Sequence, residues 1–460
     1  MLDPAPALGT VEDILRRAGA VPRFERIPSV DELNHRLEDL RRAHPDLIAV
    51  ERIGTTRLGE PIPMYHVGEG SRSALIVGGV HPNEPIGSLT ILHLMDELIS
   101  DQAFRVGSDT CWHIVPCADP DGMRLNEGWF AQPHDRERYA REFFRPAPDE
   151  QVEWTFPFAY KAAYFDAMMP ETQALARAID ETRPDLYVPL HNSEGGGAYF
   201  YLSRPLPQLY PLLHEVTASQ GVPLHTGEAE GPHFTALDVA IYEMGTLQDA
   251  YDWTEEHGLD PYPPGSAGDA STSYARRYGT LSLIAELPQF SDPRADDTQP
   301  TGTSHRDALR LCGERLVHAG STLVSLIERV EPHLRIDSPL LRAARAFAPM
   351  ALSSGQSDLA RAEVEPDRPA TVAELSSLDG GVDLHRLRWG GMLLRALQAE
   401  VDAGVAALEV RRTADELRVL FDEWLREAQA RLDGRTLPLG RIVGVQYGAI
   451  LAAHAQLEHR

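Results

Sequence analysis

Short apolar runs alternate with amphipathic segments up to about residue 330, and this pattern predicts an α/β fold. The runs predicted to be strands are 48–53, 61–67, 74–80, 111–115, 186–190 and 281–286. The run 74–80 is continuously apolar, which is typical of a strand buried on both faces of a parallel sheet. Leucines recur at helical spacing over residues 30–44, and Ser29 before them is a candidate N-cap, so we predict a helix there. Residues 89–99 and 170–181 are predicted to form two more helices. We therefore expect a mixed, mainly parallel twisted sheet flanked by helices.

The pattern changes after about residue 330, where strand-like runs become scarce. Residues 353–380 are rich in Ser, Asp, Pro and Gly and are expected to form a linker or an irregular stretch. Residues 384–432 predict two or three amphipathic helices. We expect two domains, an α/β domain over 1–335 and a helical C-terminal extension over 336–460. The extension could be a dimerisation module that forms a homo-oligomer, a lid over a cleft, or a partner-binding domain.

Composition and charge narrow the classes of function. Apolar residues make up 43% and charged residues 24%, as in ordinary globular proteins. The formal net charge of −26 disfavours binding to nucleic acid and to anionic membranes. Three cysteines do not make a disulfide framework, and the N-terminal residues do not have the pattern of a secretory signal. Since no run approaches about 18 uncharged apolar residues, we expect a soluble cytoplasmic protein that does not associate with membranes.

Two histidines follow predicted strands, where ligand sites of α/β sheets are found. His81 and Glu84 lie in GGVHPNEPIG, and His191 follows the run 186–190. Each signal is weak alone, because His-x-x-Glu is common by chance and a strand-end histidine is usually structural. Together, two histidines and a glutamate form a three-ligand set that leaves a position for water, as in catalytic zinc sites.

Glu286 ends the apolar run 281–286, where a carboxylate is costly to bury without a partner. It is either capped or salt-bridged, or it is a general base that takes a proton from a metal-bound water.

Several short motifs over roughly 28–330 occur in an order that resembles the zinc metallocarboxypeptidases of the carboxypeptidase A type. The motifs are SVDELNHRLEDLRRAHPDL, GTTRLGEPIPMYHVG, GGVHPNEPIG, PCADPDGMRLN, FPFAYKAAYFDAMMPETQAL, VPLHNS and DPYPPGSAGDASTSY followed by LSLIAEL. The resemblance implies a carboxypeptidase-like fold and a Zn²⁺ cofactor. It also implies that His81, Glu84 and His191 bind the zinc ion.

The resemblance also implies catalytic roles for other side chains. Glu286 would be the general base and later the proton donor to the leaving amine. Arg124 would polarise the scissile carbonyl and stabilise the oxyanion, with Arg136 and Arg138 as alternatives. Tyr262 occupies the place of the family's mobile tyrosine, although a loop tyrosine near prolines is often simply packed.

The sequence departs from the family where the substrate carboxylate would bind. Glu153 and Trp154 replace the expected Asn-Arg pair, and a glutamate repels a carboxylate. Arginines that could replace the pair are Arg136, Arg138, Arg141 and Arg145. We expect Arg145 to be the substrate-binding residue, the alternative being that each arginine pairs with a nearby acid.

Specificity is less well determined by the sequence. Asp269 lies in the loop before Tyr274 that lines the pocket for the leaving residue in relatives. A buried carboxylate there would favour a basic side chain, whereas a solvated loop aspartate would not contribute. Residues 199–201, Tyr-Phe-Tyr, are expected to form a core strand rather than a recognition surface.

The sequence therefore predicts a zinc-dependent hydrolase of a peptide or amide bond, a metallopeptidase with an altered carboxylate clamp that acts on a small peptide or an acyl-amino acid. An alternative within hydrolases is an N-acyl-amino-acid deacylase of the aspartoacylase type. A non-catalytic binding or scaffold protein is the third possibility, and retention of all three ligands and Glu286 argues against it.

Overall fold

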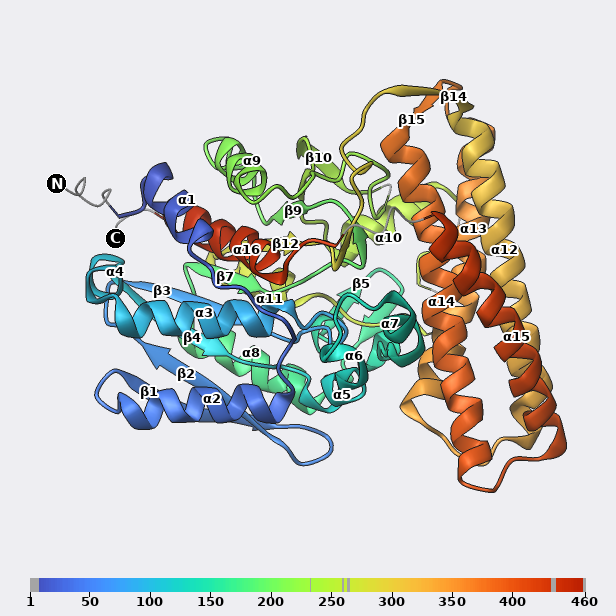
Figure 1. Cartoon of the computed structure of the whole chain (residues 1–460), viewed down its shortest axis with the longest axis horizontal. Coiled ribbons are helices and arrows are strands. Elements are labelled where there is room, and N and C mark those ends of the chain that lie inside the picture. The colour runs from blue at the N-terminus through green and yellow to red at the C-terminus, as the bar shows by residue number, and fades with distance from the viewer. Residues whose placement is uncertain (1–7, 232, 259, 263–264, 432–435, 458–460) are drawn as a thin grey trace.

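The computed structural model describes residues 8–231, 233–258, 260–262, 265–431 and 436–457. Its centre is a nine-stranded sheet, shown with its flanking helices in Figure 1. In sheet order the strands are β1 (Ile48–Thr55), β2 (Pro61–Val67), β4 (Thr110–Val115), β3 (Arg72–Val77), β7 (Leu186–Pro189), β12 (Leu281–Glu286), β9 (Tyr199–Leu202), β11 (Ile241–Glu243) and β10 (Thr235–Asp238).

The sheet is mixed, as predicted. The run β4-β3-β7-β12 is parallel, and so is the pair β9 and β11. The pairs β1–β2, β2–β4, β12–β9 and β10–β11 are antiparallel. Parallel pairs therefore form the centre and do not outnumber antiparallel ones, in contrast to the expectation of a mainly parallel sheet.

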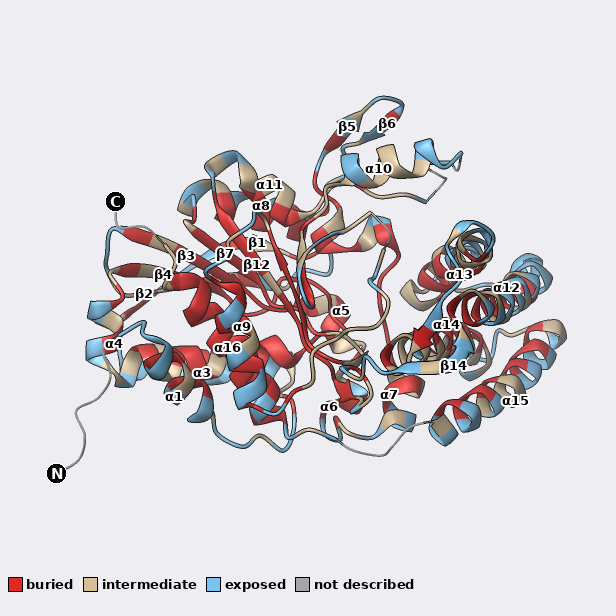
Figure 2. Cartoon of the chain, turned by 90° about the horizontal axis from the view of Figure 1, so that it is seen from above, coloured by how far each residue is buried: buried red, intermediate tan, exposed pale blue. Residues whose placement is uncertain are grey.

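Both faces of the central strands are covered by helices, which explains their continuous apolar sequences. In β3, Ala74 and Ile76 face one layer while Leu75 and Val77 face the other. The first layer contains α1 (Val11–Gly19), α2 (Val30–Ala43), α3 (Ile86–Ser100), α9 (Tyr210–Ser219) and α16 (Leu439–His454). The second layer contains α8 (Pro170–Thr182) and α11 (Ser271–Ala275). Buried residues follow the sheet and these inner helix faces in Figure 2.

The strands and early helices lie where the sequence predicts them. β2 and β12 have the predicted bounds, and α2 begins after Ser29 in a capping box with Glu32. The shorter elements are α4 (Gln102–Gly107), α5 (Pro120–Arg124), α6 (Glu127–Phe130), α7 (Arg136–Glu142), α10 (Leu247–Glu256), the ribbons β5 (Phe158–Tyr160) with β6 (Ala163–Phe165) and β8 (Gly195–Gly196) with β13 (Phe290–Ser291), and 3-10 turns at Pro148–Glu150, Val152–Trp154, Arg276–Tyr278 and Glu331–His333.

Four long helices form a bundle at one end of the molecule, on the right in Figure 1. They are α12 (His305–Val330), α13 (Pro339–Val364), α14 (Val372–Asp402) and α15 (Leu408–Arg431). The ribbon of β14 (Pro300–Ser304) and β15 (Pro369–Thr371) joins the chain on both sides of α12 and α13.

The prediction of a linker over 353–380 is wrong, because α13 and α14 include most of these residues. Small residues in this segment, such as Gly355, allow α12 and α13 to pack closely. A Cβ on Gly313 of α12 would lie 2.8 Å from the Gly355 carbonyl oxygen of α13, so glycines allow these two backbones to approach. Tertiary contact thus overrides the local preference of Ser and Gly for loops.

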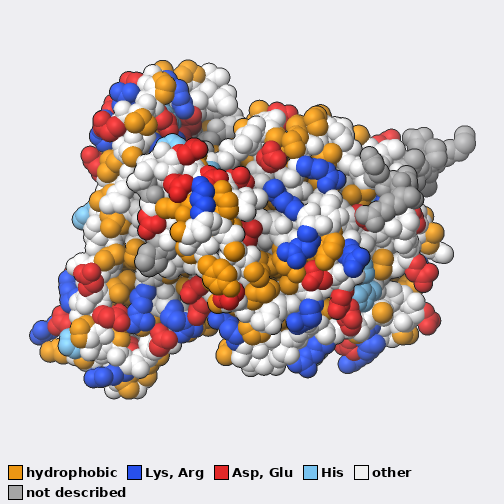
Figure 3. All heavy atoms as spheres, turned by 180° about the vertical axis from the view of Figure 1, so that it is seen from behind, with side chains coloured by type: hydrophobic (Ala, Val, Ile, Leu, Met, Phe, Trp, Pro, Cys, Tyr) orange, Lys and Arg blue, Asp and Glu red, His pale blue; other side chains and the backbone are white. Residues whose placement is uncertain are grey.

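The helical region is not a simple C-terminal extension over 336–460. α12, which precedes residue 336, belongs to the bundle, whereas the C-terminal helix α16 returns to the sheet and is buried along its whole length. The bundle is therefore an insertion between β14 and α16. No helix in the described part of the chain is both long enough and apolar enough to cross a membrane. Acidic and basic side chains are interspersed over the face shown in Figure 3.

Candidate active site

The candidate metal ligands come from the carboxyl ends of neighbouring parallel strands. His81 and Glu84 lie in the loop between β3 and α3, and His191 follows β7. One ligand atom from each side chain lies within 4.8 Å of the others. Glu286 is the last residue of β12, the next strand in the sheet. The order of the strands therefore brings together residues that are far apart in the sequence.

Local backbone contacts hold the two ligand loops in place. Gly79 has a φ of +60°, and a Cβ there would lie 2.7 Å from the Cys117 sulfur, so glycine is required where the chain leaves β3. The Asn192 side chain accepts a hydrogen bond from the first backbone N–H of α3, at 3.2 Å from the Ile86 nitrogen. The loop that contains His191 thus caps the helix that follows Glu84.

The buried C-terminal helix also supports His191. The Gln446 side-chain amide of α16 donates to the His191 carbonyl at 2.8 Å, and its oxygen accepts from the Thr90 hydroxyl at 2.6 Å. Gln446 is 1% exposed. A buried amide with both ends bonded fixes its neighbours firmly, since losing either bond would leave a desolvated polar group.

The ligand side chains are in mutual contact. His191 Nδ1 lies 3.0 Å from Glu84 Oε2 and 3.5 Å from Glu286 Oε1. The rings of His81 and His191 are 4.9 Å apart between centroids. His81 Nδ1 is buried and has no hydrogen-bond partner among the described residues. A buried imidazole nitrogen without a partner, in a histidine grouped with a carboxylate and a second histidine, is the arrangement that a metal ion satisfies.

Burial and charge together set the protonation of this group. Burial lowers the pKa of His81, and the positive charge of Arg145 lowers it further. Burial opposes the charged form of His191, but the hydrogen bond and negative charge of Glu84 outweigh it and raise the His191 pKa to about 9. Burial, and then the charge of Glu84, raise the pKa of Glu286 well above its usual range. A divalent cation would favour the neutral histidines and ionised carboxylates that ligation needs.

The donor set fits zinc. Two imidazoles and one carboxylate are the protein ligands of a catalytic zinc site, and they leave a position for water or substrate. A second group, Glu228, His305 and Glu374, also brings ligand atoms within 4.8 Å of one another. There, Glu228 is bound by Arg361 and Glu374 by Arg368, so arginines already neutralise both carboxylates. We interpret that second group as an ion-pair network.

Arg145, the expected carboxylate clamp, lies beside the ligands with its guanidinium already engaged. It donates to Glu84 Oε1 at 2.8 Å and to Gln151 at 3.1 Å, and it stacks over the Trp154 ring at 5.0 Å. Glu153 is fully buried, accepts the Ser271 hydroxyl at 2.7 Å, and has a pKa raised by burial to about 7. Of the two residues that replace the Asn-Arg pair, Trp154 therefore packs against Arg145, whereas Glu153 is bound by Ser271.

The site opens into a cavity of about 1080 Å³ that both parts of the molecule line. The sheet side contributes the metal ligands, Glu286 and the loops around them, and the bundle contributes residues of α13, α14 and α15. Arg388 of α14 donates to Glu194 Oε2 at 2.6 Å, three residues after His191. Phe290 N and Gln289 N donate to the carbonyls of Glu194 and Ser193. Arg388 thus joins the bundle to the loop that carries a candidate metal ligand.

The structure places three expected site residues outside this cavity. The Arg124 guanidinium is engaged by Glu60 at 2.6 Å and by Asp31 at 2.8 Å. The Tyr262 hydroxyl donates to the Ala267 carbonyl at 2.8 Å, in a cluster with Phe158. Asp269 pairs through its backbone with Phe156. None of the three is among the residues that line the cavity.

Arg136, an alternative in the sequence analysis, does line the cavity. Its guanidinium stacks over the Phe290 ring at 4.6 Å, and burial lowers its pKa. The other arginines of the cavity wall each have an acidic partner: Arg145 with Glu84, Arg294 with Asp292, Arg361 with Glu228, Arg388 with Glu194 and Arg431 with Asp383. Among the described residues, no carboxylate lies within ion-pair distance of Arg136.

Comparison with known proteins agrees with the site. The model of the zinc carboxypeptidase family matches residues 33–218, which include His81, Glu84 and His191. This part of the chain is therefore similar to the zinc carboxypeptidase family. Carboxypeptidase B of Astacus astacus is 29% identical over 97 residues, 20% of this chain and 32% of that protein. The chain thus matches about a third of the length of this curated carboxypeptidase B.

Solved structures of carboxypeptidases are also similar in part. Carboxypeptidase A from Helicoverpa armigera has 16% identity and a TM-score of 0.38, covering 76% of this chain and 79% of that one. A metallo-carboxypeptidase from Burkholderia cenocepacia has 17% identity and a TM-score of 0.33, covering 57% and 61%. Glu286 and the bundle lie beyond the segment that the family model matches.

The residues that sequence reasoning missed act through tertiary contacts. Gln446 and Arg388 lie more than 190 residues from the groups they bind, in helices whose own patterns indicate only packing. Tyr199, Phe200 and Tyr201 are all buried, as expected of a core strand, and Tyr199 and Tyr201 also border the cavity. Because successive side chains of a strand point to opposite faces, the sequence alone could have separated Tyr199 and Tyr201 from Phe200.

Proposed function

We propose that the protein is a zinc-dependent hydrolase that cleaves a peptide or amide bond in a small substrate with a free carboxylate. The observation that supports this proposal is the convergence of His81, Glu84 and His191 with Glu286 at one end of the cavity. The bundle covers the cavity from the other side, which favours short substrates over folded proteins.

The residues divide the chemistry between them. A zinc ion held by His81, Glu84 and His191 supplies Lewis acidity to a carbonyl and lowers the pKa of water. Glu286 accepts a proton from the attacking water and returns it to the leaving nitrogen as the tetrahedral intermediate collapses. The buried surroundings that raise the pKa of Glu286 make its protonated form a competent acid for the second step.

Arg145 is a positioning residue in this proposal. Its hydrogen bond to Glu84 Oε1 fixes the rotamer of a metal-binding carboxylate, and its stacking on Trp154 fixes the guanidinium in turn. Such outer contacts orient ligands and tune their affinity for metal.

Arg136 is the cation that we propose to bind the substrate carboxylate. It lines the cavity, it has no ion-pair partner among the described residues, and Phe290 holds its guanidinium flat. A planar guanidinium with free N–H groups suits bidentate binding of a carboxylate.

The Arg136→Ala variant should lose about 10- to 100-fold in kcat/KM toward substrates with a free carboxylate, since a hydrogen bond to a charged group contributes about 1.5–3 kcal/mol. Amidated versions of the same substrates should lose little. Arg138→Ala is the matched control, because Arg138 lies on the same helix, is exposed and does not line the cavity. Equal losses on acid and amide substrates would contradict the assignment.

Elemental analysis of the purified protein and a hydrolysis screen test the proposed function together. We expect about one zinc per chain and hydrolysis that is lost on chelation and restored by zinc. The screen compares dipeptides, longer peptides with a free carboxyl terminus and N-acyl amino acids, so the preferred class separates a peptidase from a deacylase. A protein that binds no zinc and hydrolyses none of these substrates would be a binding or scaffold protein instead.

A further inference from the structure

We propose that Glu230, together with Tyr199 and Tyr201, forms a subsite in the catalytic cavity for a cationic group of the substrate, an ammonium or a guanidinium. The inference rests on the proposed function, because the ligand is a substrate of the same metal-containing cavity. It concerns a carboxylate in the loop before β10, outside the segment that the family model matches.

The charges that line the cavity single out Glu230. The other carboxylates that line the cavity each have a basic partner, apart from Glu153, which is buried and accepts hydrogen bonds from Ser271. The pairs are Glu84–Arg145, Glu194–Arg388, Glu228–Arg361, Glu286–His191, Asp292–Arg294, Asp358–Arg361, Asp379–Arg315 and Asp383–Arg431. Among the described residues, no cation lies within ion-pair distance of Glu230, and the residue is exposed to the cavity.

Two tyrosines hold the Glu230 carboxylate in position. The hydroxyl of Tyr199 donates to one carboxylate oxygen at 2.7 Å, and that of Tyr201 donates to the other at 2.8 Å. Hydrogen bonds from neutral donors stabilise the anion without cancelling its charge. A fixed anion with one side open to the cavity is a ready partner for a cation.

The strand register places this carboxylate beside the proposed chemistry. In the β9–β12 ladder, Tyr199 lies opposite Glu286 and Tyr201 lies opposite Ile284. Directly opposed residues point to the same face of a sheet, and all four side chains line the cavity. Glu230 accepts hydrogen bonds from these two tyrosines, so it lies on the side of the sheet that bears the proposed general base.

Aromatic rings complete the surroundings of a cation site. The rings of Tyr199 and Tyr201 are 5.8 Å apart between centroids, and Phe234 packs 5.0 Å from Tyr201 and also lines the cavity. Faces of aromatic rings attract ammonium and guanidinium groups, and a neighbouring carboxylate adds a charge–charge attraction. With Arg136 on the wall near Phe290, the cavity would recognise a substrate that bears both signs of charge.

Binding to an inactive but metal-loaded enzyme tests this subsite without relying on turnover. In the Glu286→Gln background loaded with zinc, Kd is measured by calorimetry for pairs of dipeptides that differ only in lysine against norleucine, with the variable residue on either side of the peptide bond. We expect the lysine peptide of one series to bind at least about 10-fold more tightly, as for one partly desolvated charge pair.

Adding Glu230→Gln should reduce the lysine-to-norleucine ratio to near 1, because glutamine keeps the shape and removes the charge. Glu215→Gln, an exposed change of the same net charge on α9, should keep the ratio. A ratio near 1 in the starting enzyme for both series, or a ratio that survives Glu230→Gln, would overturn the subsite. Failure of the proposed function would be seen separately, as absence of zinc or of hydrolysis by the enzyme with Glu286 intact.

Discussion

Replacing Glu286 by glutamine should lower kcat by about 10²- to 10⁴-fold, the usual contribution of a general acid–base residue. Glutamine has nearly the same shape, so it can occupy the place beside His191, where Glu286 Oε1 lies 3.5 Å from Nδ1. Its amide cannot accept a proton from the attacking water or return one to the leaving nitrogen. KM should change less than kcat, because the lost interaction acts in the transition state.

The metal content of the same variant separates two roles for Glu286. If Glu286 is a base and not a ligand, the glutamine variant should retain about one zinc per chain, whereas His191→Ala should lose most of it. Glu215→Gln provides the control for a change of net charge far from the cavity, and it should keep the original kcat. A glutamine variant that keeps its zinc and loses less than about threefold in kcat would remove Glu286 from the mechanism.

The strands and the convergence of the candidate metal ligands were predictable, because the apolar pattern of each run and the order of the strands both place these residues at one edge of the sheet. Runs such as 74–80 are apolar at every residue because helices cover both faces of β3, so their period and length identify buried strands. His81 and His191 follow such runs, and the ends of adjacent parallel strands meet. No knowledge of side-chain packing is needed for this step.

The arginines could not be assigned in the same way. Arg124 is held by Glu60 from the turn before β2 and by Asp31 from the first turn of α2. Arg136, twelve residues later, stacks on Phe290 and has no such partner in the described chain. Both are arginines in short segments after the same strand, and only the partners brought by the fold distinguish them.

The segment 199–201 was predicted correctly as a core strand, since all three aromatic side chains are buried. The prediction did not separate the two faces that the alternation of a strand creates. Phe200 packs in the main core, whereas Tyr199 and Tyr201 pack in a second core cluster that also borders the cavity, and their hydroxyls donate to Glu230. The hydroxyls themselves were a usable signal, since buried tyrosines need hydrogen-bond partners.

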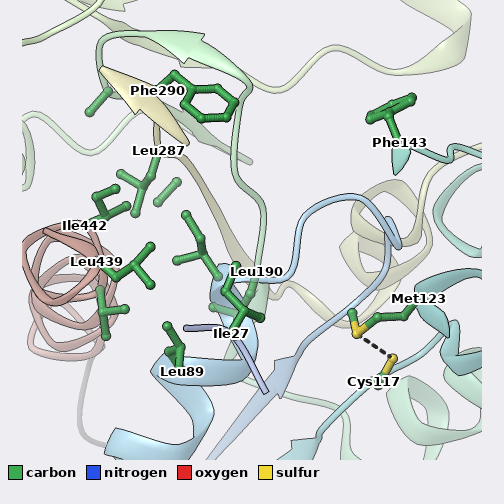
Figure 4. Close-up of a cluster of buried hydrophobic side chains, with 14 of the residues drawn as sticks. Ile27, Leu89, Cys117, Met123, Phe143, Leu190, Leu287, Phe290, Leu439 and Ile442 are labelled. Carbon is green, nitrogen blue, oxygen red and sulfur yellow. Dashed lines mark hydrogen bonds between the residues drawn. The ribbon is translucent and has the colours of Figure 1, made fainter. Parts of the chain in front are cut away.

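Ending the chain after Arg431 should prevent folding of the α/β part, although the deleted residues follow the whole helical bundle. α16 is buried along its length and packs against α1, α3 and α9. Figure 4 shows Leu439 and Ile442 of α16 directed toward Leu190 and Leu287, which directly precede His191 and follow Glu286. Without α16, these residues and the sheet beneath them would be exposed to water. We expect an aggregated or non-cooperatively unfolding product.

A single substitution measures the same contact without removing a helix. Ile442→Ala should lower the free energy of unfolding by about 2–5 kcal/mol, because Ile442 is fully buried in the main core cluster. Val419→Ala on the bundle helix α15, where the side chain is 71% exposed, should change it by less than about 0.5 kcal/mol. Chemical denaturation of both variants provides the comparison. If α16 were an appendage, the two substitutions would have similar small effects and the chain ending at Arg431 would still unfold cooperatively and bind zinc. If α16 completes the core of the sheet, the Ile442 variant loses stability, and the shortened chain neither unfolds cooperatively nor binds zinc. The reason is that α16 supports the two strand ends that bear His191 and Glu286.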